Sequence, residues 1–307
     1  VTCVLVVLGT GLAGLLIPAF QTYPTQWQIT TGSAWSDLVK WINVNFYDAL
    51  EAIKTALLLN VLIPVKRFLL AMPWAWVTLL LTVGAWQLAG ARLAALVLAL
   101  CAFIIVNGQW PKAMVSVYLC AISVVIASLI GISAGIVSAP RPRLWQAMRV
   151  VVDTLQTLPS FVYLIPVVML FRVGDFSAMI AIVAYSVVPA IRYTVHGIQK
   201  VDPQLIEAGV VSGCTRRQVL WKIQLPLAMP EIMLGINQTI MLALSMLVIT
   251  ALVGTRDLGQ EVYIALTKAD TGRGLVAGLS VAFIAIIADR MIAAGVARMR
   301  RRLGVDA

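Results

Sequence analysis

The side chains best placed to do chemistry in this chain gather in one polar segment, residues 202–230, which lies between two long apolar runs. The segment carries a carboxylate, Glu207, and three cations, Arg216, Arg217 and Lys222. Charges of this kind are expensive inside a bilayer, and a hairpin buried between two spans would not need them. A surface that docks a soluble partner does need them, because complementary charges select and orient the partner. We therefore predict an interaction surface here.

The local sequence predicts two short helices in this segment. Asp202 is followed by a proline, a pairing typical of a helix start, because the carboxylate accepts a free N–H and proline lacks one. Gly213 is placed to end this first helix, since glycine adopts the left-handed conformation at little cost. Thr215 and Gln218 have the spacing of a capping box for a second helix, which Pro226 is expected to stop. The prediction is a helix–turn–helix between two membrane spans.

The sequence holds no constellation for catalysis. The phosphate-loop pattern GxxxxGK[ST] does not occur, so we expect no ATP site of the usual kind in this chain. A GxGxxG stretch at residues 9–14 lies in an apolar run without a βαβ unit, so small residues on a packed helix face explain it better. The four scattered cysteines and the single histidine show no metal-ligand spacing.

Carboxylates at mid-span, the usual mark of proton or sodium coupling, are also missing from the predicted spans. Asp153 and Asp289 fall near predicted cytoplasmic span ends, where hydration or neighbouring arginines can satisfy them. This pattern argues against a secondary transporter. Any energy for transport is expected to come from outside the chain.

The composition predicts a polytopic α-helical membrane protein. Of its 307 residues, 61% are hydrophobic and only 12% are charged, which excludes an ordinary soluble domain. The net charge of +10 could suggest nucleic acid, but the basic residues gather in a few short loops and at the C-terminus. Positive-inside orientation produces that distribution, so we expect a lipid bilayer and no nucleic acid as partner.

The polar segment also carries the residues of a family resemblance. Three sets of residues agree in spacing with the EAA-x3-G-x9-I-x-LP signature of ABC importer permeases: Glu207-Ala208-Gly209, Gly213 and Ile223-Gln224-Leu225-Pro226. One position departs, because Gly209 stands where the family has its second alanine. The stretches QTLPSFVYLIPVVMLF, VLWKIQLPLAMPEIM and NQTIMLALSMLVI narrow the resemblance to the glycine betaine/proline betaine (quaternary amine) permeases. The resemblance covers residues 110–299, with a weaker echo from 70 to 109.

The resemblance implies an all-α polytopic membrane protein with the fold of a type I ABC importer transmembrane domain, located in the cell inner membrane. It implies that ATP and magnesium are bound by partner ATPases and that this chain is no enzyme and holds no cofactor. The implied partners are a second permease half, two ATPase subunits and a periplasmic or external substrate-binding protein. The ATPase-coupling loop would then comprise Glu207, Ala208, Gly209, Gly213, Arg216, Arg217, Ile223, Leu225 and Pro226.

Apolar runs and loop charges predict eight spans with the C-terminus in the cytoplasm. A span needs about 20 apolar residues, and the runs found are 1–20, 74–90, 93–109, 113–139, 158–171, 178–194, 232–253 and 275–295. The first run lacks the basic start of a signal peptide, so we interpret it as a span. Basic loops at 141–149 and 200–222 and the arginine-rich tail share the cytoplasmic side. Residues 1–110 form an N-terminal part, and 111–307 the core permease domain with the coupling loop at 202–226.

Residues 33–70 are expected to lie along the membrane surface. Trp35, Leu38, Ile42 and Phe46 recur at helical spacing among polar residues, which indicates an amphipathic helix in the interface plane. The eight-span topology puts this segment outside. Lys66 and Arg67 mildly oppose that placement under the positive-inside rule.

Prolines and uncharged polar side chains in the core spans suggest a translocation path. Broken backbone at membrane depth is tolerated where it lines a watery cavity, although a kinked helix packed by its neighbours explains a proline as well. Uncharged polar and soft groups suit a methylated cation, which full charges would hold too tightly to release. Packing between helices accounts for any one of these residues equally well. The candidate lining residues are Pro159, Tyr163, Asn237, Met241, Ser245 and Met246.

Taken together, the sequence predicts the permease subunit of an ATP-driven importer for a quaternary amine or betaine-type solute, such as glycine betaine, proline betaine, choline, carnitine or an amine oxide. An ABC permease for another small solute, such as an amino acid, is the alternative within the same class. A channel that needs no ATPase is the alternative from a different class.

Overall fold

The computed structural model describes residues 2, 4, 6, 10 and 30–303, with side chains up to Arg301. The predicted first span, residues 1–20, lies outside the described residues except for four single positions. Within the described residues the structure is helical and has no strand. Its elements are α2 (Gly32–Asn45), α3 (Tyr47–Leu57), η3 (Leu58–Leu62), α4 (Ile63–Ala71), α5 (Trp74–Ala89), α6 (Ala91–Val106), α7 (Trp110–Ser138), α8 (Pro142–Thr157), η4 (Ser160–Tyr163), α9 (Leu164–Phe171), α10 (Asp175–Gln199), α11 (Pro203–Val211), α12 (Arg216–Val219), η5 (Leu220–Gln224), α13 (Leu225–Thr250), η6 (Ala251–Val253), α14 (Leu258–Thr267) and α15 (Thr271–Leu303).

The chain divides into two compact units, Val1–Tyr47 and Asp48–Ala307. Within the first unit, the described part consists mainly of α2. This helix is amphipathic as predicted, and none of its residues is buried. The side chain of Trp35 is 66% exposed, and the rings of Trp41 and Phe46 meet edge to face with centroids 5.8 Å apart. Among the described residues of its own unit, nothing covers the apolar stripe of α2.

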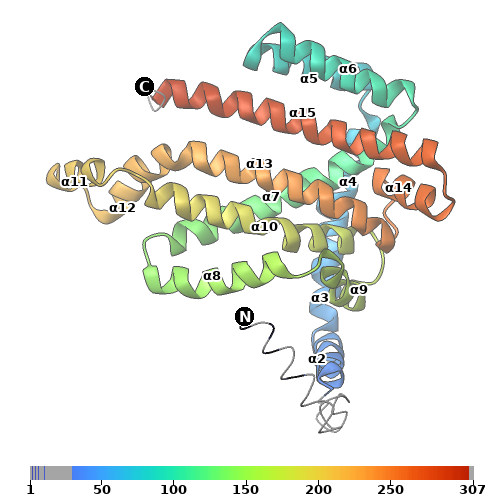
Figure 1. The fold of residues 1–307 in the computed structure, drawn as a ribbon, viewed down its shortest axis with the longest axis horizontal. Coiled ribbons are helices and arrows are strands. Elements are labelled where there is room, and N and C mark those ends of the chain that lie inside the picture. Colours follow the sequence, from blue (N-terminus) through green and yellow to red (C-terminus); the bar gives the residue numbers. More distant parts are fainter. Residues whose placement is uncertain (1, 3, 5, 7–9, 11–29, 304–307) are drawn as a thin grey trace. The chain divides into compact units, whose positions relative to one another are not determined.

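Three long helices, α7, α10 and α13, run side by side and form the centre of the second unit (Figure 1). Glycines let two of them approach closely. A Cβ on Gly131 would lie 2.5 Å from the Cβ of Ala190, and a Cβ on Gly135 would lie 2.6 Å from that of Thr194. Only residues without a side chain fit at such a crossing, because each addition would have to displace a neighbouring helix. The apolar core of the unit lies between these three helices.

Four helices are long and apolar enough to cross a membrane, judged by length and composition among the described residues: Trp110–Ser138, Asp175–Gln199, Arg216–Val253 and Thr271–Arg301. The number rises to six if each of two sharply bent helix pairs counts as one span. Ala91–Val106 is apolar but shorter. The helices predicted from 74–90, 93–109, 113–139, 178–194, 232–253 and 275–295 are all present; the count of eight spans stays a prediction.

The predicted span at 158–171 is not a single helix. Residues 142–157, expected to begin as a basic loop, form helix α8, and the chain then bends by 108° into η4 and α9. The bend falls at Leu158, whose ψ of 132° is extended. The following Pro159 explains this, because a proline ring disfavours helical backbone in the residue before it. The apolar run thus turns where a straight span was expected.

A second expectation was wrong at Pro226, which does not stop the helix before it. The helical path continues from α12 through the wider turn η5 into α13, and Pro226 lies in the first turn of α13. The N–H of Leu225 reaches back five residues to the carbonyl of Leu220. A proline interrupts a regular helix because it lacks an N–H and crowds the carbonyl four residues earlier. The wider turn spaces these groups differently, so the helix accommodates the proline.

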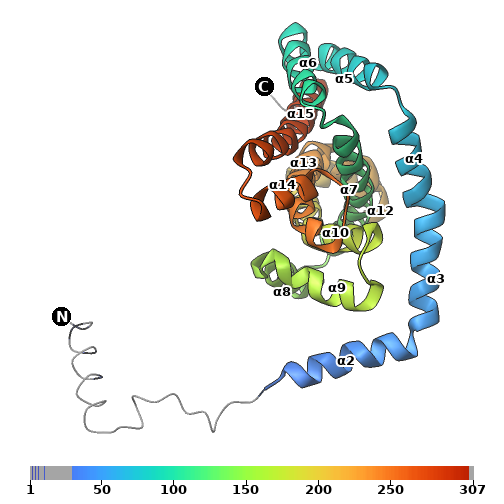
Figure 2. The same ribbon diagram turned by 90° about the vertical axis from the view of Figure 1, so that its right-hand side faces the viewer.

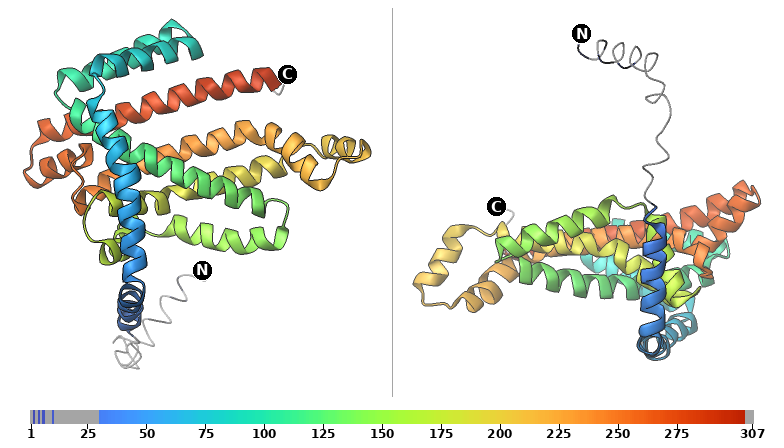
Figure 3. Two further views of the ribbon diagram at one scale, coloured as in Figure 1. Left: turned by 180° about the vertical axis from the view of Figure 1, so that it is seen from behind. Right: turned by 90° about the horizontal axis from the view of Figure 1, so that it is seen from below.

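The segment formed by α3, η3 and α4 runs across the long helices (Figures 2 and 3). An ion pair joins this segment to the start of α10, where Asp175 Oδ2 lies 2.7 Å from Lys66 Nζ. The hydroxyl of Tyr118 donates a hydrogen bond to the same carboxylate. At the opposite ends of the helices, Nη1 of Arg298 donates to the carbonyl of Gln87, 3.3 Å away. The hairpin of α5 and α6 packs mainly against α15.

Candidate functional site

The polar segment forms the predicted helix–turn–helix at the joint between α10 and α13. The Asp202 carboxylate accepts the N–H of Gln204 at 2.8 Å and so caps α11. Gly213 has a φ of +80°, which explains why a glycine occupies the turn. Both bonds of the capping box are present: Gln218 N–H to the Thr215 hydroxyl at 3.3 Å, and Thr215 N–H to the Gln218 side chain at 2.8 Å. Figure 1 shows α11 and α12 projecting beyond the ends of the long helices.

The charges of this segment point outward and are free to meet a partner. Glu207, Arg216 and Arg217 are exposed, and none of them belongs to an ion pair among the described residues. Apolar side chains accompany them, with Val211 88% and Trp221 53% exposed. Exposed apolar groups rimmed by unpaired charges are typical of interaction sites.

The remaining residues of the segment pack α11 against the helical path that leads into α13. Gly209 is buried, and a Cβ placed on it would come within 2.4 Å of Cδ1 of Ile223. Ile223 and Leu225 are partly buried, whereas Ala208 and Pro226 are exposed. The glycine at position 209, where alanine was expected, therefore has a local reason. It lets α11 approach the side chain of Ile223.

The residues predicted to line a path are only partly brought together. Pro159 and Ser245 are exposed, and Met241 is partly buried. Met246 is fully buried in the core of the unit. Nδ2 of Asn237 donates to Asp289 Oδ1 at 2.7 Å, which joins α13 to α15.

The broken helix at η4 carries the sixth of these residues, Tyr163. Its hydroxyl donates to the carbonyl of Leu155, across the bend between α8 and η4. Its ring meets that of Tyr185 edge to face, with centroids 5.7 Å apart. Tyr185 was missed from the sequence because nothing in the spacing of α10 sets it apart from the apolar residues around it.

The predicted span-end carboxylates are satisfied by arginines, as expected. Asp153 on α8 contacts Arg192 on α10 and lies 3.7 Å from Arg149. Asp289 lies 3.8 Å from Arg290 in addition to its bond with Asn237. Of these contacts, Asp153 with Arg192 joins α8 to α10, and Asp289 with Asn237 joins α15 to α13.

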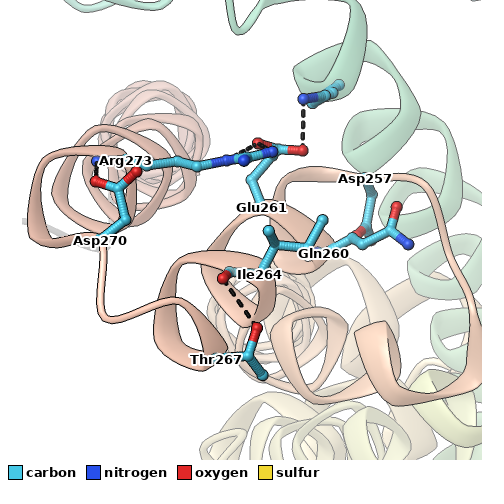
Figure 4. A network of polar contacts seen from close by, with 8 residues as sticks. Asp257, Gln260, Glu261, Ile264, Thr267, Asp270 and Arg273 are labelled. Atoms are coloured by element: carbon cyan, nitrogen blue, oxygen red, sulfur yellow. Dashed lines mark hydrogen bonds and ion pairs between the residues drawn. The ribbon is translucent and has the colours of Figure 1, made fainter.

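A polar network at the other end of the long helices was missed from the sequence (Figure 4). The carboxylate of Glu261 on α14 is almost fully buried and receives two cations, Lys112 Nζ at 2.5 Å and Arg273 Nη2 at 2.7 Å. Burial alone would raise the pKa of Glu261, but the bonds from Lys112 and Arg273 outweigh it, so its pKa is lowered. The network fixes α14 between the start of α7 and the start of α15.

Asp257, at the start of α14, has the opposite electrostatic situation. Its side chain is fully buried; Oδ1 accepts the N–H of Gln260 at 3.0 Å, and Oδ2 is buried with no hydrogen-bond partner in the part of the chain that the structure describes. Burial raises the pKa of Asp257 from 3.8 to about 6, partly offset by the bonds from Gln260 and Thr255.

The arrangement of long helices with a helix–turn–helix at one end resembles a solved permease. The inward-facing MetNI methionine ABC transporter matches with a TM-score of 0.56 at 18% sequence identity, over 64% of this chain and 96% of that chain. This likeness shows the fold alone. The fold class is that of a type I ABC importer permease, as the sequence predicted.

Residues 127–301 match the sequence profile of the binding-protein-dependent transport system inner membrane components. The chain belongs to this family of inner-membrane permeases. The matched region includes the whole helix–turn–helix and all of α10 to α14.

Three similar proteins are transport system permeases. The trimethylamine N-oxide transport system permease protein TmoV of Pelagibacter ubique is 42% identical over 90% of this chain, and the chain spans 39% of its length. The glycine betaine/proline betaine transport system permease protein ProW of Escherichia coli is 36% identical over 82% of this chain and 71% of its own length. The glycine betaine transport system permease protein OpuAB of Bacillus subtilis is 36% identical over 82% of this chain and 89% of its own length. The chain thus spans about two fifths of the length of the TmoV proteins it matches.

Proposed function

We propose that this chain is the translocating subunit of an ATP-driven importer for a quaternary amine or a related methylated solute, trimethylamine N-oxide included. The observation that carries the proposal is the helix–turn–helix at 202–226, with Glu207, Arg216 and Arg217 exposed and unpaired between two spanning helices. The similar permeases, which are named for glycine betaine, proline betaine and trimethylamine N-oxide transport, support the solute class.

The proposed assembly contains a second permease half, two ATPase subunits and an external binding protein. The helix–turn–helix would be the coupling site, where the ATPase binds the exposed charged and apolar side chains. The C-terminus and this segment would face the cytoplasm. The support for a shared side is that the end of α15 lies beside the end of α5, and that Arg300 lies beside the start of α11.

We further propose that the solute path runs past the bend at Pro159 and the exposed face of α13 at Ser245. The bend leaves backbone groups of residues 158–160 outside a regular helix, and Ser245 presents an uncharged polar group whose hydroxyl bonds back to Met241 O at 3.0 Å. Such a lining can solvate a methylated cation without trapping it. Asn237 would contribute to the path indirectly, since its amide is already bonded to Asp289.

The test is solute-stimulated ATP hydrolysis and uptake by the reconstituted complex carrying Glu207→Lys. A wrong-sign charge in a docked interface can cost several kcal/mol, so uptake and stimulation should fall together while the permease stays folded in the membrane. Asp48→Lys makes the same charge change on the exposed face of α3 and should leave both activities unchanged. Normal uptake with Glu207→Lys would rule out this segment as the coupling site. Uptake that needs no ATPase at all would favour the channel.

A further inference from the structure

A cavity of 240 Å³ lies where four elements meet at the end of the long helices: the end of α10, the start of α11, the first turns of α13 and the end of α15. Its apolar wall includes Leu205 and Leu227, and its charged side chains are Lys200, Asp202, Glu231 and Arg300. At about 30 Å³ for each water in the liquid, the space exceeds what a single water fills.

Three of the four charged groups already have partners. Lys200 Nζ pairs with Glu231 Oε1 at 2.8 Å, and Asp202 Oδ1 accepts the N–H of Gln204 as the cap of α11. Arg300 differs, because its Nε–H is buried and has no acceptor among the described residues. Among the carboxylates of the described residues, none forms an ion pair with its guanidinium either. The cavity therefore holds one guanidinium that lacks a counter-charge.

We propose that this cavity binds a phosphate group, with the guanidinium of Arg300 as the principal ligand. A guanidinium that lines an apolar cavity without a counter-charge is costly, so an occupant that supplies acceptor oxygens to it stabilises the site. The planar guanidinium matches phosphate through two parallel N–H donors. Lys200 lines the same cavity, although Glu231 offsets its charge.

Two carboxylates of this cavity oppose such an anion: Glu231, which Lys200 offsets, and Asp202. Asp202 lines the same cavity, and only one of its two oxygens is used by the cap. Its negative charge should weaken phosphate binding without abolishing it. Because Asp202 and Leu205 belong to the coupling segment, an occupied cavity would touch the element through which we propose the ATPase acts. A bound phosphate would then bias the position of α11, which is regulation beyond transport itself.

The test measures inorganic phosphate binding to the full-length permease in detergent by calorimetry at low ionic strength. Arg300→Gln should weaken binding by about tenfold or more, the loss expected for a charge-assisted pair. Arg301→Gln removes the same charge one residue away, outside the cavity, and should change binding little. Asp202→Asn keeps the capping oxygen, removes the repulsion and should tighten binding. This gain remains measurable even if Arg300→Gln folds poorly.

A second arm identifies the source of the phosphate. The permease is reconstituted in nanodiscs of phosphatidylcholine with or without phosphatidylglycerol, and retained lipid is counted by native mass spectrometry. Loss of retained phosphatidylglycerol in Arg300→Gln alone assigns the site to a lipid headgroup. Equal lipid retention together with Arg300-dependent binding of inorganic phosphate assigns it to a soluble phosphate. Absence of binding in both arms, or equal losses in Arg300→Gln and Arg301→Gln, would overturn the proposal and leave a water-filled cavity.

Discussion

Cδ1 of Ile223 occupies the space where a side chain on Gly209 would begin, because a Cβ built on that glycine would lie 2.4 Å away. The contact joins α11 to the helical path that continues into α13. Val219 Cγ2 approaches the same position, 3.6 Å away, so α11 is packed against this path on both sides of η5's start. A docked partner that pushes α11 would therefore push a membrane-spanning helix as well.

The first prediction tests this contact by a double-mutant cycle. Gly209→Ala gains about 1 kcal/mol of helix propensity but forces Ile223 to move, and overpacking typically costs about 1–3 kcal/mol. The single variant should therefore be no more stable than the wild type. Ile223→Val removes the methyl that clashes, so the double variant should be more stable than the sum of the single changes predicts. Thermal unfolding in detergent measures all four proteins. Additive effects would mean that the contact is absent in the working protein.

The second prediction concerns the turn between α11 and α12. Gly213 has a φ of +80°, and the space where a side chain would lie is open. Gly213→Val should therefore lower the stability only through backbone strain, by about 1 kcal/mol or more. The strain should displace Arg216 and Arg217 and reduce solute-stimulated ATP hydrolysis. Gly108 offers a matched control, because its φ is +68°, its surroundings are equally open and it lies in the turn before α7. Gly108→Val should cost similar stability and preserve coupling. Equal coupling in both variants would show that the turn does not matter.

The third prediction is topological. The native Cys214 lies in the coupling segment, and we expect it in the cytoplasm, whereas position 270, between α14 and α15, should be external. In right-side-out vesicles, an impermeant maleimide should label Asp270→Cys and spare Cys214. The other three cysteines, Cys3, Cys101 and Cys120, are replaced by alanine for this experiment. Labelling of both positions from one face would contradict the topology.

The fourth prediction is that two carboxylates on neighbouring turns give opposite pH dependence. The folded-state pKa of Asp257 is raised from 3.8 to about 6, so its contribution to stability is complete below pH 3.8 and is lost as the pH rises through 6. A shift of about two units corresponds to about 3 kcal/mol. Asp257→Asn keeps the cap and should raise the melting temperature at pH 8 but change it little at pH 4. An unchanged melting temperature at pH 8 would mean that the carboxylate is solvated.

Glu261 supplies the comparison. Its pKa is lowered below 4.5 by Lys112 and Arg273, so its contribution is present above pH 4.5 and is lost as the pH falls through the folded-state value. Glu261→Gln should therefore destabilise the protein at pH 7 and have a smaller effect in acid. Both cations are partly exposed, which limits the loss to about 1–2 kcal/mol.

The fifth prediction concerns the apolar stripe of α2, which we propose lies in the external membrane interface. Ile42→Asp places a charge in the stripe. It should impair assembly and uptake, because the charged face can no longer bury itself in the membrane interface. Val44→Asp makes a comparable change on the opposite side of the same helix, where the side chain is 79% exposed, and should be tolerated. Uptake and complex recovery from membranes provide the readouts. Wild-type behaviour of Ile42→Asp would exclude a buried role for the stripe.

The local structure of the coupling segment could be predicted from the sequence because it depends on residues a few positions apart. The cap at Asp202, the capping box of Thr215 and the left-handed Gly213 each involve a backbone group within three residues. The spans follow from composition, since a bilayer demands about 20 apolar residues with internal backbone bonding. The spacing of Glu207, Gly213 and Ile223 also indicated the family from the sequence alone.

Tertiary structure decided what depends on partners distant in the chain. The way α8 packs along α10 depends on the contact between Asp153 and Arg192, which are 39 residues apart in the chain. The burial of Met246 and the bond of Asn237 to Asp289 depend on which face of α13 meets the neighbouring helices. A uniformly apolar helix presents no stripe that would reveal this face, so only packing selects the side that turns inward.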